Sequence, residues 1–417
     1  MKEHSNIFIK LLSAAIFEKA PDFLLSLPDW DSIYEEAKAH QVHTLLFPLF
    51  EKLPAELRPA SSLLEVWKYE TLREAALQLL HMEQMEKVLL LLHKADIPVI
   101  ALKGLVLRSY YPNPELRTMG DADILIQKED FRKVHTVLTS LGYKKRKHDE
   151  RHTAYSLNGY PDIELHGILT DSEEMEKLNH FTSQVWDNTI PAFIGSAPAL
   201  SLSPKDQVVY LMFHIIHHVL LSGVGIRQLC DLTVFAVSHA EDIIWEDILY
   251  EMELYGYDKF TLVLLSLCRE LFDLSLAENL ITEEEEEFET YRNLLTEDII
   301  NSGVYGKRTK EREASRHILL YMKNKHPLFP PAEEAVKPSA LKGSSLCSLL
   351  RFFFPAPGKL SYQYRYARKH PILLPIAWLH RAFYNIRHLS WLFFFYNRES
   401  VSAYTDRIEL LTWLKLR

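Results

Sequence analysis

The hydrophobic pattern of this chain changes near residue 96, and the parts on either side must fold differently. Before the change, apolar residues recur at helical spacing, most clearly over a long predicted helix at residues 62–95. After it, residues 97–102 form a short apolar run rich in β-branched side chains. Residues 121–126 alternate acidic and apolar side chains and then become fully apolar. Both segments are typical of buried strands, so the chain requires a sheet inside a mostly helical protein.

We place the sheet in a small mixed-sheet α+β module at residues 96–190, embedded in a mostly α-helical protein. A helix is expected at residues 129–141, and Gly142 stands at its C-terminal stop. Two more strands, at 154–157 and 162–166, are expected on either side of an Asn158-Gly159 turn. Other helices are expected at residues 105–111, 204–221, 226–239, 245–255 and 260–274.

Five regions follow from these patterns and from local composition. They are an N-terminal helical region (1–95), the α+β module (96–190), a helical region completing the cleft (191–305), a proline-containing linker or loop (306–345) and a basic, aromatic helical region (346–417). From residue 342 onward there are twelve Lys and Arg residues against three acidic ones, although the whole chain carries a net charge of −9.

Composition excludes some classes of function. A chain with this net charge is not built as a whole to coat nucleic acid, and we expect no DNA partner. Its three cysteines are far apart and form neither a disulfide framework nor a CxxC metal site, which favours a reducing compartment. No stretch of 18 uncharged apolar residues is present. We therefore expect a cytoplasmic protein.

Two carboxylates on the second predicted strand carry the chemistry. Asp121 and Asp123 alternate along it, so they share one face with Cα atoms about 6.6 Å apart. Their mutual repulsion disfavours a structural role, and a divalent cation removes it. Oxygen ligands on a short rigid element suit Mg²⁺ or Mn²⁺. Glu164, on another predicted strand, is the candidate third acid of a two-metal site. The alternative for an isolated Asp-x-Asp is a structural role, as a loop cap or a pair of solvated carboxylates.

Nearby polar residues leave alternatives open. Arg117 either contacts phosphate, or holds the acids by an ion pair, or forms a plain structural salt bridge. His166 either touches the nucleotide or a metal edge, or is a hydrogen-bonded structural histidine. His214 and His218 share a helix face, so they bind zinc, pack, or line a substrate cleft beside the acids.

The order of these motifs resembles a known family. Leu-Lys-Gly at 102–104, Tyr-Pro-x-Pro-x-x-Arg-x-x-Gly-Asp-x-Asp-Ile-Leu-Ile at 111–126, Leu-Gly-Tyr at 141–143 and Ile-Glu-Leu-His at 163–166 look like the uncharacterised nucleotidyltransferase family of bacteria. That family belongs to the polymerase-β-like nucleotidyltransferase superfamily. The resemblance covers roughly residues 30–300.

The resemblance implies that Asp121 and Asp123 hold the catalytic metals and that Glu164 stands at the place of the third acid. The superfamily usually has Gly-Ser at the end of the first strand, where this chain has Lys103-Gly104. Gly104 still permits a close backbone approach, and Lys103 can supply charge to the phosphates. The candidate nucleotide-binding residues are Lys103, Gly104, Arg117, Gly120 and His166.

The implied activity is metal-dependent transfer of a nucleoside monophosphate from an NTP, such as ATP, to an acceptor hydroxyl or phosphate. The acceptor class stays open among a sugar phosphate, a peptide, a protein and RNA. The alternative is a non-catalytic nucleotide-binding or membrane-surface protein on the same scaffold. The region 346–417 has three interpretations, namely packing helices, a peripheral membrane element, or a docking surface for an acidic partner.

Overall fold

The computed structural model confirms a mixed α+β protein and describes most of the chain. The described residues are 3–148, 152–169, 179–221, 223–277, 280, 286–304, 366–367, 370–387 and 398–416. They fall into two units, one made of Met1–Tyr305 with Trp413–Arg417 and one made of Gly306–Thr412. The candidate site lies in the first unit.

A seven-stranded mixed sheet has the order β3-β4-β5-β2-β1-β7-β6. Its strands are β1 (Ile100–Ala101), β2 (Asp121–Leu125), β3 (Lys144–His148), β4 (His152–Ser156), β5 (Asp162–His166), β6 (Ile190–Ile194) and β7 (Ala197–Ser201). The pairs β2–β5 and β1–β7 are parallel, and the other neighbours are antiparallel.

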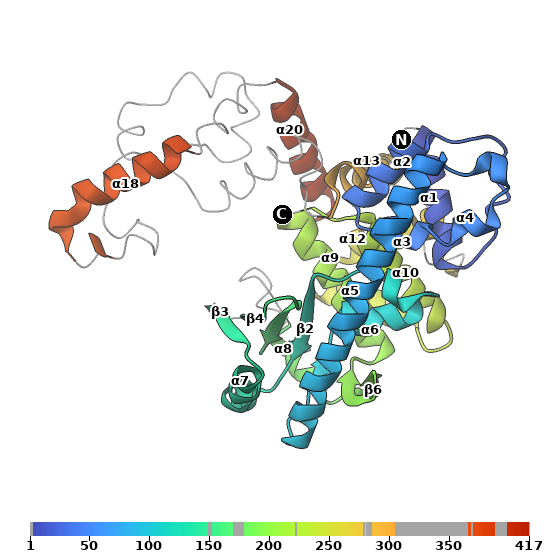
Figure 1. Cartoon of the computed structure of the whole chain (residues 1–417). Helices are drawn as coiled ribbons and strands as arrows, with labels where there is room; N and C mark the ends of the chain where they lie inside the picture. Colours follow the sequence, from blue (N-terminus) through green and yellow to red (C-terminus); the bar gives the residue numbers. More distant parts are fainter. Residues whose placement is uncertain are drawn as a thin grey trace. The chain divides into compact units, whose positions relative to one another are not determined.

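The helices of the first unit confirm the periodicity of the sequence. They are α1 (Glu3–Ile16), α2 (Trp30–Ala39), α3 (His43–Leu46), α4 (Leu49–Lys52), α5 (Ser61–Lys94), α6 (Gly104–Leu107), α7 (Phe131–Ser140), α8 (Asn179–Gln184), α9 (Pro204–Leu221), α10 (Ile226–Ser238), α11 (Trp245–Leu254), α12 (Asp258–Phe272) and α13 (Glu286–Ser302). Figure 1 shows α5 running from the N-terminal helices down past the sheet.

Local signals explain where these elements end. Gly142 follows α7 with φ 88°, a left-handed conformation that glycine adopts without strain, and the Tyr143 N–H closes the turn on the Leu138 carbonyl at 3.0 Å. Gly159 has φ 85° in the turn between β4 and β5. The predicted stop and the predicted turn are therefore both confirmed.

Three strands were not expected from the sequence. β3 consists of four basic residues and one histidine, so it shows no apolar alternation. β6 and β7 contain Pro191 and Pro198, residues that argue against a strand except at an edge or a strand end. β3 and β6 are the two edge strands, and the sheet continues beyond residue 190.

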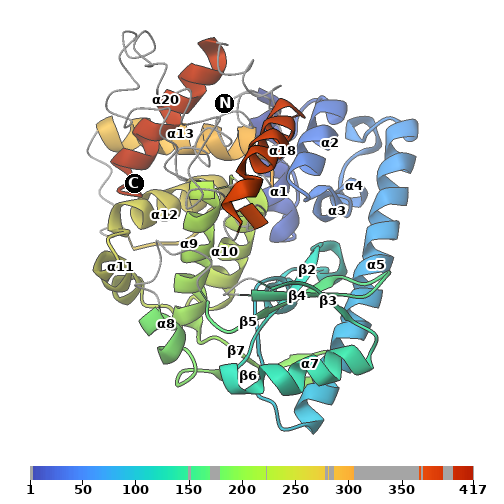
Figure 2. The same ribbon diagram turned by 90° about the vertical axis from the view of Figure 1, so that its left-hand side faces the viewer.

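The two faces of the sheet differ in chemistry. Ala122, Ile124 and Ile163 belong to one buried apolar cluster with residues of α5 and α7. Because side chains alternate along a strand, Asp123 and Glu164 lie on the opposite face. Figure 2 shows α9 and α10 on the other side of the strands from α7.

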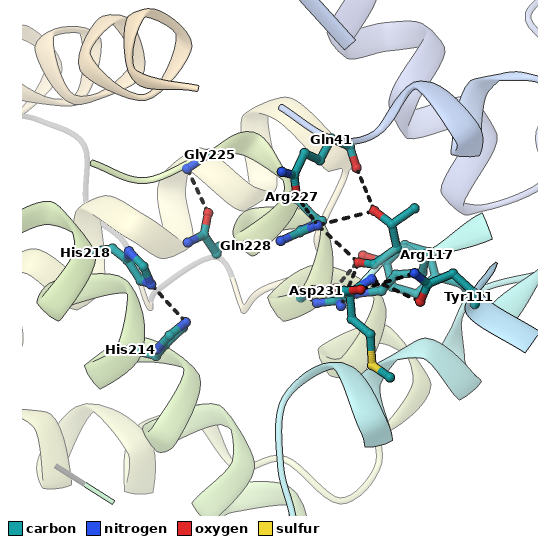
Figure 3. A network of polar contacts seen from close by, with 12 residues as sticks. Gln41, Tyr111, Arg117, His214, His218, Gly225, Arg227, Gln228 and Asp231 are labelled. Atoms are coloured by element: carbon teal, nitrogen blue, oxygen red, sulfur yellow. Dashed lines mark hydrogen bonds and ion pairs between the residues drawn. The ribbon is translucent and has the colours of Figure 1, made fainter. Parts of the chain in front are cut away.

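A buried ion pair joins the segment before β2 to α10. Arg117 donates to Asp231 through Nε at 3.0 Å and through Nη2, so the contact is bidentate (Figure 3). The Tyr111 hydroxyl donates to the same carboxylate at 2.8 Å. The structure thus makes Arg117 a cross-element salt bridge with Asp231, one of the alternatives open from the sequence.

Three more side chains hold the same segment by its backbone. Gln78 on α5 donates to the Met119 carbonyl and accepts from the Met119 N–H, both at 3.1 Å. Thr44 donates to the Leu116 carbonyl, and Arg227 donates to the Thr118 carbonyl. The approach to β2 is therefore fixed from three other parts of the chain.

The second unit is described only in part. Its described elements are η9 (Pro371–Leu373), α18 (Leu374–Arg387) and α20 (Arg398–Trp413), whose last residue belongs to the first unit. The predicted linker 306–345 lies outside the described residues. Ile372 and Leu379 are exposed. Among the described residues, no helix has the length and apolar character needed to cross a membrane.

We predict that Asp231→Ala lowers the free energy of unfolding by about 3–5 kcal/mol, because it leaves the buried Arg117 guanidinium without its carboxylate. Urea denaturation followed by circular dichroism measures this loss. Asp242→Ala is the matched control, since it removes an exposed carboxylate paired with His239 just after α10. The control is expected to lose less than about 1 kcal/mol. Equal losses in the two variants would contradict the role of the ion pair.

Candidate active site

The pairing of β2 with β5 brings the predicted acids to one place. In this parallel register Asp121 stands opposite Asp162, and Asp123 stands opposite Glu164. Asp121, Asp123 and Glu164 all line one cavity of about 230 Å³. Asp123 and Glu164, 41 positions apart in the sequence, therefore face the same space, and the catalytic role of the three acids stays a prediction.

Asp123 is a buried carboxylate that accepts hydrogen bonds from a lysine and a histidine. Its Oδ1 accepts hydrogen bonds from Lys103 Nζ and His166 Nε2, both at 2.8 Å. Burial alone would raise the pKa of Asp123, but Lys103 and His166 outweigh it and hold that pKa well below its ordinary value. Asp123 is therefore ionised, and neither of the two bonds uses its Oδ2 atom.

Asp121 and Glu164 behave in the opposite way. Partial desolvation in the cavity and the neighbouring Asp123 charge raise the pKa of Asp121, although its side chain reaches solvent. Desolvation, followed by the charges of Asp123 and Asp121, likewise raises the pKa of Glu164. Among these three carboxyl groups, only Asp123 has a pKa held below its ordinary value by its cationic partners, and added positive charge would relieve the other two.

The donor set fits a divalent metal. Asp123, Glu164 and His166 offer ligand atoms that all lie within 4.8 Å of one another. His166 Nε2 already donates to Asp123, so we assign it to orienting that carboxylate. Asp123 and Glu164 would then supply carboxylate oxygens, the ligands that Mg²⁺ and Mn²⁺ prefer. Asp121 lies outside this group of three but lines the same cavity, and its place as a further ligand stays a prediction.

Lys103 is held in a strained backbone conformation. Its φ of 47° and ψ of −124° lie in a region that glycine adopts far more easily than lysine. This geometry ends the segment after β1 and begins α6, and Lys103 Nζ reaches Asp123 from there. The glycine-like backbone conformation thus occurs at Lys103, one residue before the glycine that the sequence offers for a close backbone approach.

Gly104 is required for a reason the sequence did not show. A Cβ at this position would lie 2.6 Å from Arg117 Nη1 and 3.1 Å from the Met119 Cβ. The buried guanidinium therefore occupies the space that any side chain would need. Gly120 has open space beside it and lines the approach to Asp121.

The opposite wall of the cavity comes from α9 and α10. His214, His217 and His218 line it, and so do Arg227 and Gln228. Figure 3 shows His214 and His218 on one helix and Arg227 and Gln228 on another. Arg227 donates to Gln41 Oε1 at 2.9 Å, and Gln228 accepts from the Gly225 N–H at 2.7 Å. Gln228 was not singled out from the sequence, because no motif marks it and only the contact between α10 and α9 brings it to the cavity of the histidines.

Comparison with known proteins agrees with the resemblance found in the motifs. A model of an uncharacterised nucleotidyltransferase family matches residues 26–273, which is more than half of the 417-residue chain. The match includes all seven strands of the sheet and every residue that lines the cavity except Val304. No curated protein and no solved structure matches the chain.

We predict that two aspartates of the cavity affect stability with opposite signs in metal-free protein at neutral pH. Asp121→Asn is expected to raise Tm, because it removes a charge that the cavity disfavours. Asp123→Asn is expected to cost about 1.5–3 kcal/mol, since it removes the charged acceptor of two hydrogen bonds. Differential scanning calorimetry in EDTA measures both effects.

The pH dependence follows from the same shifts. The folded pKa of Asp123 is depressed, so its stabilising effect is present above the ordinary value of 3.8 and is lost as pH falls below it. The folded pKa of Asp121 is raised, so its destabilising effect disappears as pH falls through that raised value. A Tm difference between wild type and Asp121→Asn that persists unchanged from pH 7 to pH 4 would contradict this assignment.

Proposed function

We propose that this chain, which belongs to the uncharacterised nucleotidyltransferase family, transfers a nucleoside monophosphate from an NTP to an acceptor hydroxyl or phosphate with release of pyrophosphate. The acceptor is drawn from sugar phosphates, peptides, proteins and RNA, and ATP is the first nucleotide to test. We place the reaction in the cytoplasm.

One observation carries the proposal. Asp121, Asp123 and Glu164 come from two strands and line one cavity, and desolvation together with the Asp123 charge raises the pKa values of Asp121 and Glu164. Such a cluster is stable with its charges compensated by a divalent cation. When bound, Mg²⁺ or Mn²⁺ would supply charge neutralisation and polarise the phosphoryl oxygens.

The other residues act by position and charge. His166 fixes the orientation of the Asp123 carboxylate, as a partner of a metal-binding group does. Lys103 neutralises Asp123 in the absence of substrate, and in the reaction it would direct its charge to the triphosphate. Arg117 is committed to Asp231 and positions the loop before β2, so we do not assign it to the nucleotide.

One observation favours a second candidate, a non-catalytic nucleotide-binding protein on the same scaffold. The Lys103 ammonium already compensates the charge of Asp123, whose pKa is held well below its ordinary value. A chain that had lost its metal would keep such an internal cation. Binding without transfer is the behaviour that this candidate predicts.

We predict that incubation with α-³²P-labelled NTPs, Mg²⁺ and cell extract labels an acceptor in a way that depends on Asp123. Asp123→Asn is expected to reduce labelling on the order of a thousandfold, equivalent to about 4 kcal/mol of lost transition-state stabilisation. EDTA is expected to abolish it.

The matched control is Asp162→Asn. Asp162 lies on β5 in the same alternation as Glu164, but it pairs with Arg146 and is not part of the cavity wall. Labelling by this variant is expected to equal that of wild type. Nucleotide binding is measured in parallel by isothermal titration calorimetry, with each of the four NTPs and with Mg²⁺ or Mn²⁺. Binding of a nucleotide without any labelled product would support the non-catalytic candidate instead.

A further inference from the structure

Two histidines of α9 each place their Nε2 atom at the same point of the cavity wall. His214 and His218 are one helical turn apart, and their Nε2 atoms lie 3.2 Å from each other (Figure 3). Their rings are nearly perpendicular, with an interplanar angle of 83°. Both side chains line the cavity that holds the three acids.

This spacing is the one that a shared metal ion imposes. Two Zn–N bonds of about 2.05 Å at a tetrahedral angle separate the nitrogens by about 3.3 Å. Histidines at i and i+4 of a helix present their rings on one face, as in helical zinc motifs. The alternative is a single proton shared between the two nitrogens.

The protonation state of His214 suits a metal. Burial, with the charge of Lys103 and the neighbouring histidines, holds the pKa of His214 well below its ordinary value. Neutral imidazole is the form that binds metal ions. Lys103, which faces the pair from the sheet side, is itself ion-paired with Asp123, so its charge is partly compensated.

The donor chemistry separates this point from the acidic cluster. Imidazole nitrogen suits Zn²⁺, whereas a set of carboxylate oxygens suits Mg²⁺ or Mn²⁺. The histidine pair comes from α9 on one wall and the carboxylates from β2 and β5 on the other, where the one imidazole of the acidic cluster, His166, is hydrogen-bonded to Asp123. A cation that prefers nitrogen and one that prefers oxygen can therefore occupy the same cavity at different positions.

We propose that His214 and His218 form a second metal site, selective for Zn²⁺ or a similar imidazole-binding ion, on the wall of the cavity opposite the acids. The protein supplies two ligands, and the remaining coordination positions open into the cavity. A thiolate, carboxylate or phosphate group that enters the cavity completes the coordination. The site binds zinc whether or not the chain transfers nucleotides.

The test is zinc titration of the full chain after removal of metals by chelation. Excess Mg²⁺ is present to occupy the carboxylates, and isothermal titration calorimetry reports affinity and stoichiometry. Co²⁺ serves as a second probe, because its visible absorption reports nitrogen ligation and tetrahedral geometry. One equivalent of Zn²⁺ is expected to bind wild type, and His214→Gln and His218→Gln are each expected to bind at least about 100-fold more weakly.

Two variants serve as controls. His217→Gln removes a histidine of the same helix and the same wall, and Asp162→Asn removes a carboxylate of β5 that is not part of the cavity wall. Both are expected to keep zinc affinity within about threefold of wild type. The proposal is overturned if wild type binds no zinc beside excess Mg²⁺, which is the outcome of a shared proton. It is also overturned if binding survives both His214→Gln and His218→Gln, or is lost equally in His217→Gln.

Discussion

The cavity depends on one buried ion pair, between Arg117 before β2 and Asp231 on α10. The exposed fractions of the two side chains are 6% and 5%, so neither charge can reach water if its partner moves away. A bidentate contact fixes the angle between its groups as well as their distance. This contact therefore sets the spacing between β2, which carries Asp121 and Asp123, and α10. Gly104 belongs to the same arrangement, because the guanidinium occupies the place of its side chain.

Within the cavity, environment divides three similar acids into two roles. Asp123 has Lys103 and His166 as partners and is ionised at any physiological pH. Asp121 and Glu164 have no comparable compensation of their charges, and desolvation, followed by the repulsion from Asp123, raises their pKa values. The protein keeps this repulsion, although a neutral side chain in place of Asp121 or Glu164 would remove it. That is the usual mark of a site kept for binding rather than for stability.

Sequence could predict the parts of this arrangement that have a period or a stop signal. The helices α5, α9 and α10, strand β2 and the Gly142 stop follow from apolar spacing and turn chemistry, and the alternation in β5 placed Glu164 on the face of Asp123. It could not predict the partner of Arg117, because Asp231 lies 114 residues away and an ion pair leaves no periodic trace. It also missed β3, β6 and β7, whose basic or proline-containing sequences form strands only because a sheet is already present for them to extend.

Lys103 connects the strain in the backbone to the charge in the cavity. A lysine at φ 47° and ψ −124° carries a cost of about 1–3 kcal/mol that a glycine there would avoid. In return its ammonium lies 2.8 Å from Asp123 and compensates a carboxylate whose side chain is only 3% exposed. Lys103 also lines the cavity, so in the proposed reaction its ammonium would direct its charge to the triphosphate. A single strained residue can therefore stabilise the Asp123 carboxylate and contact substrate.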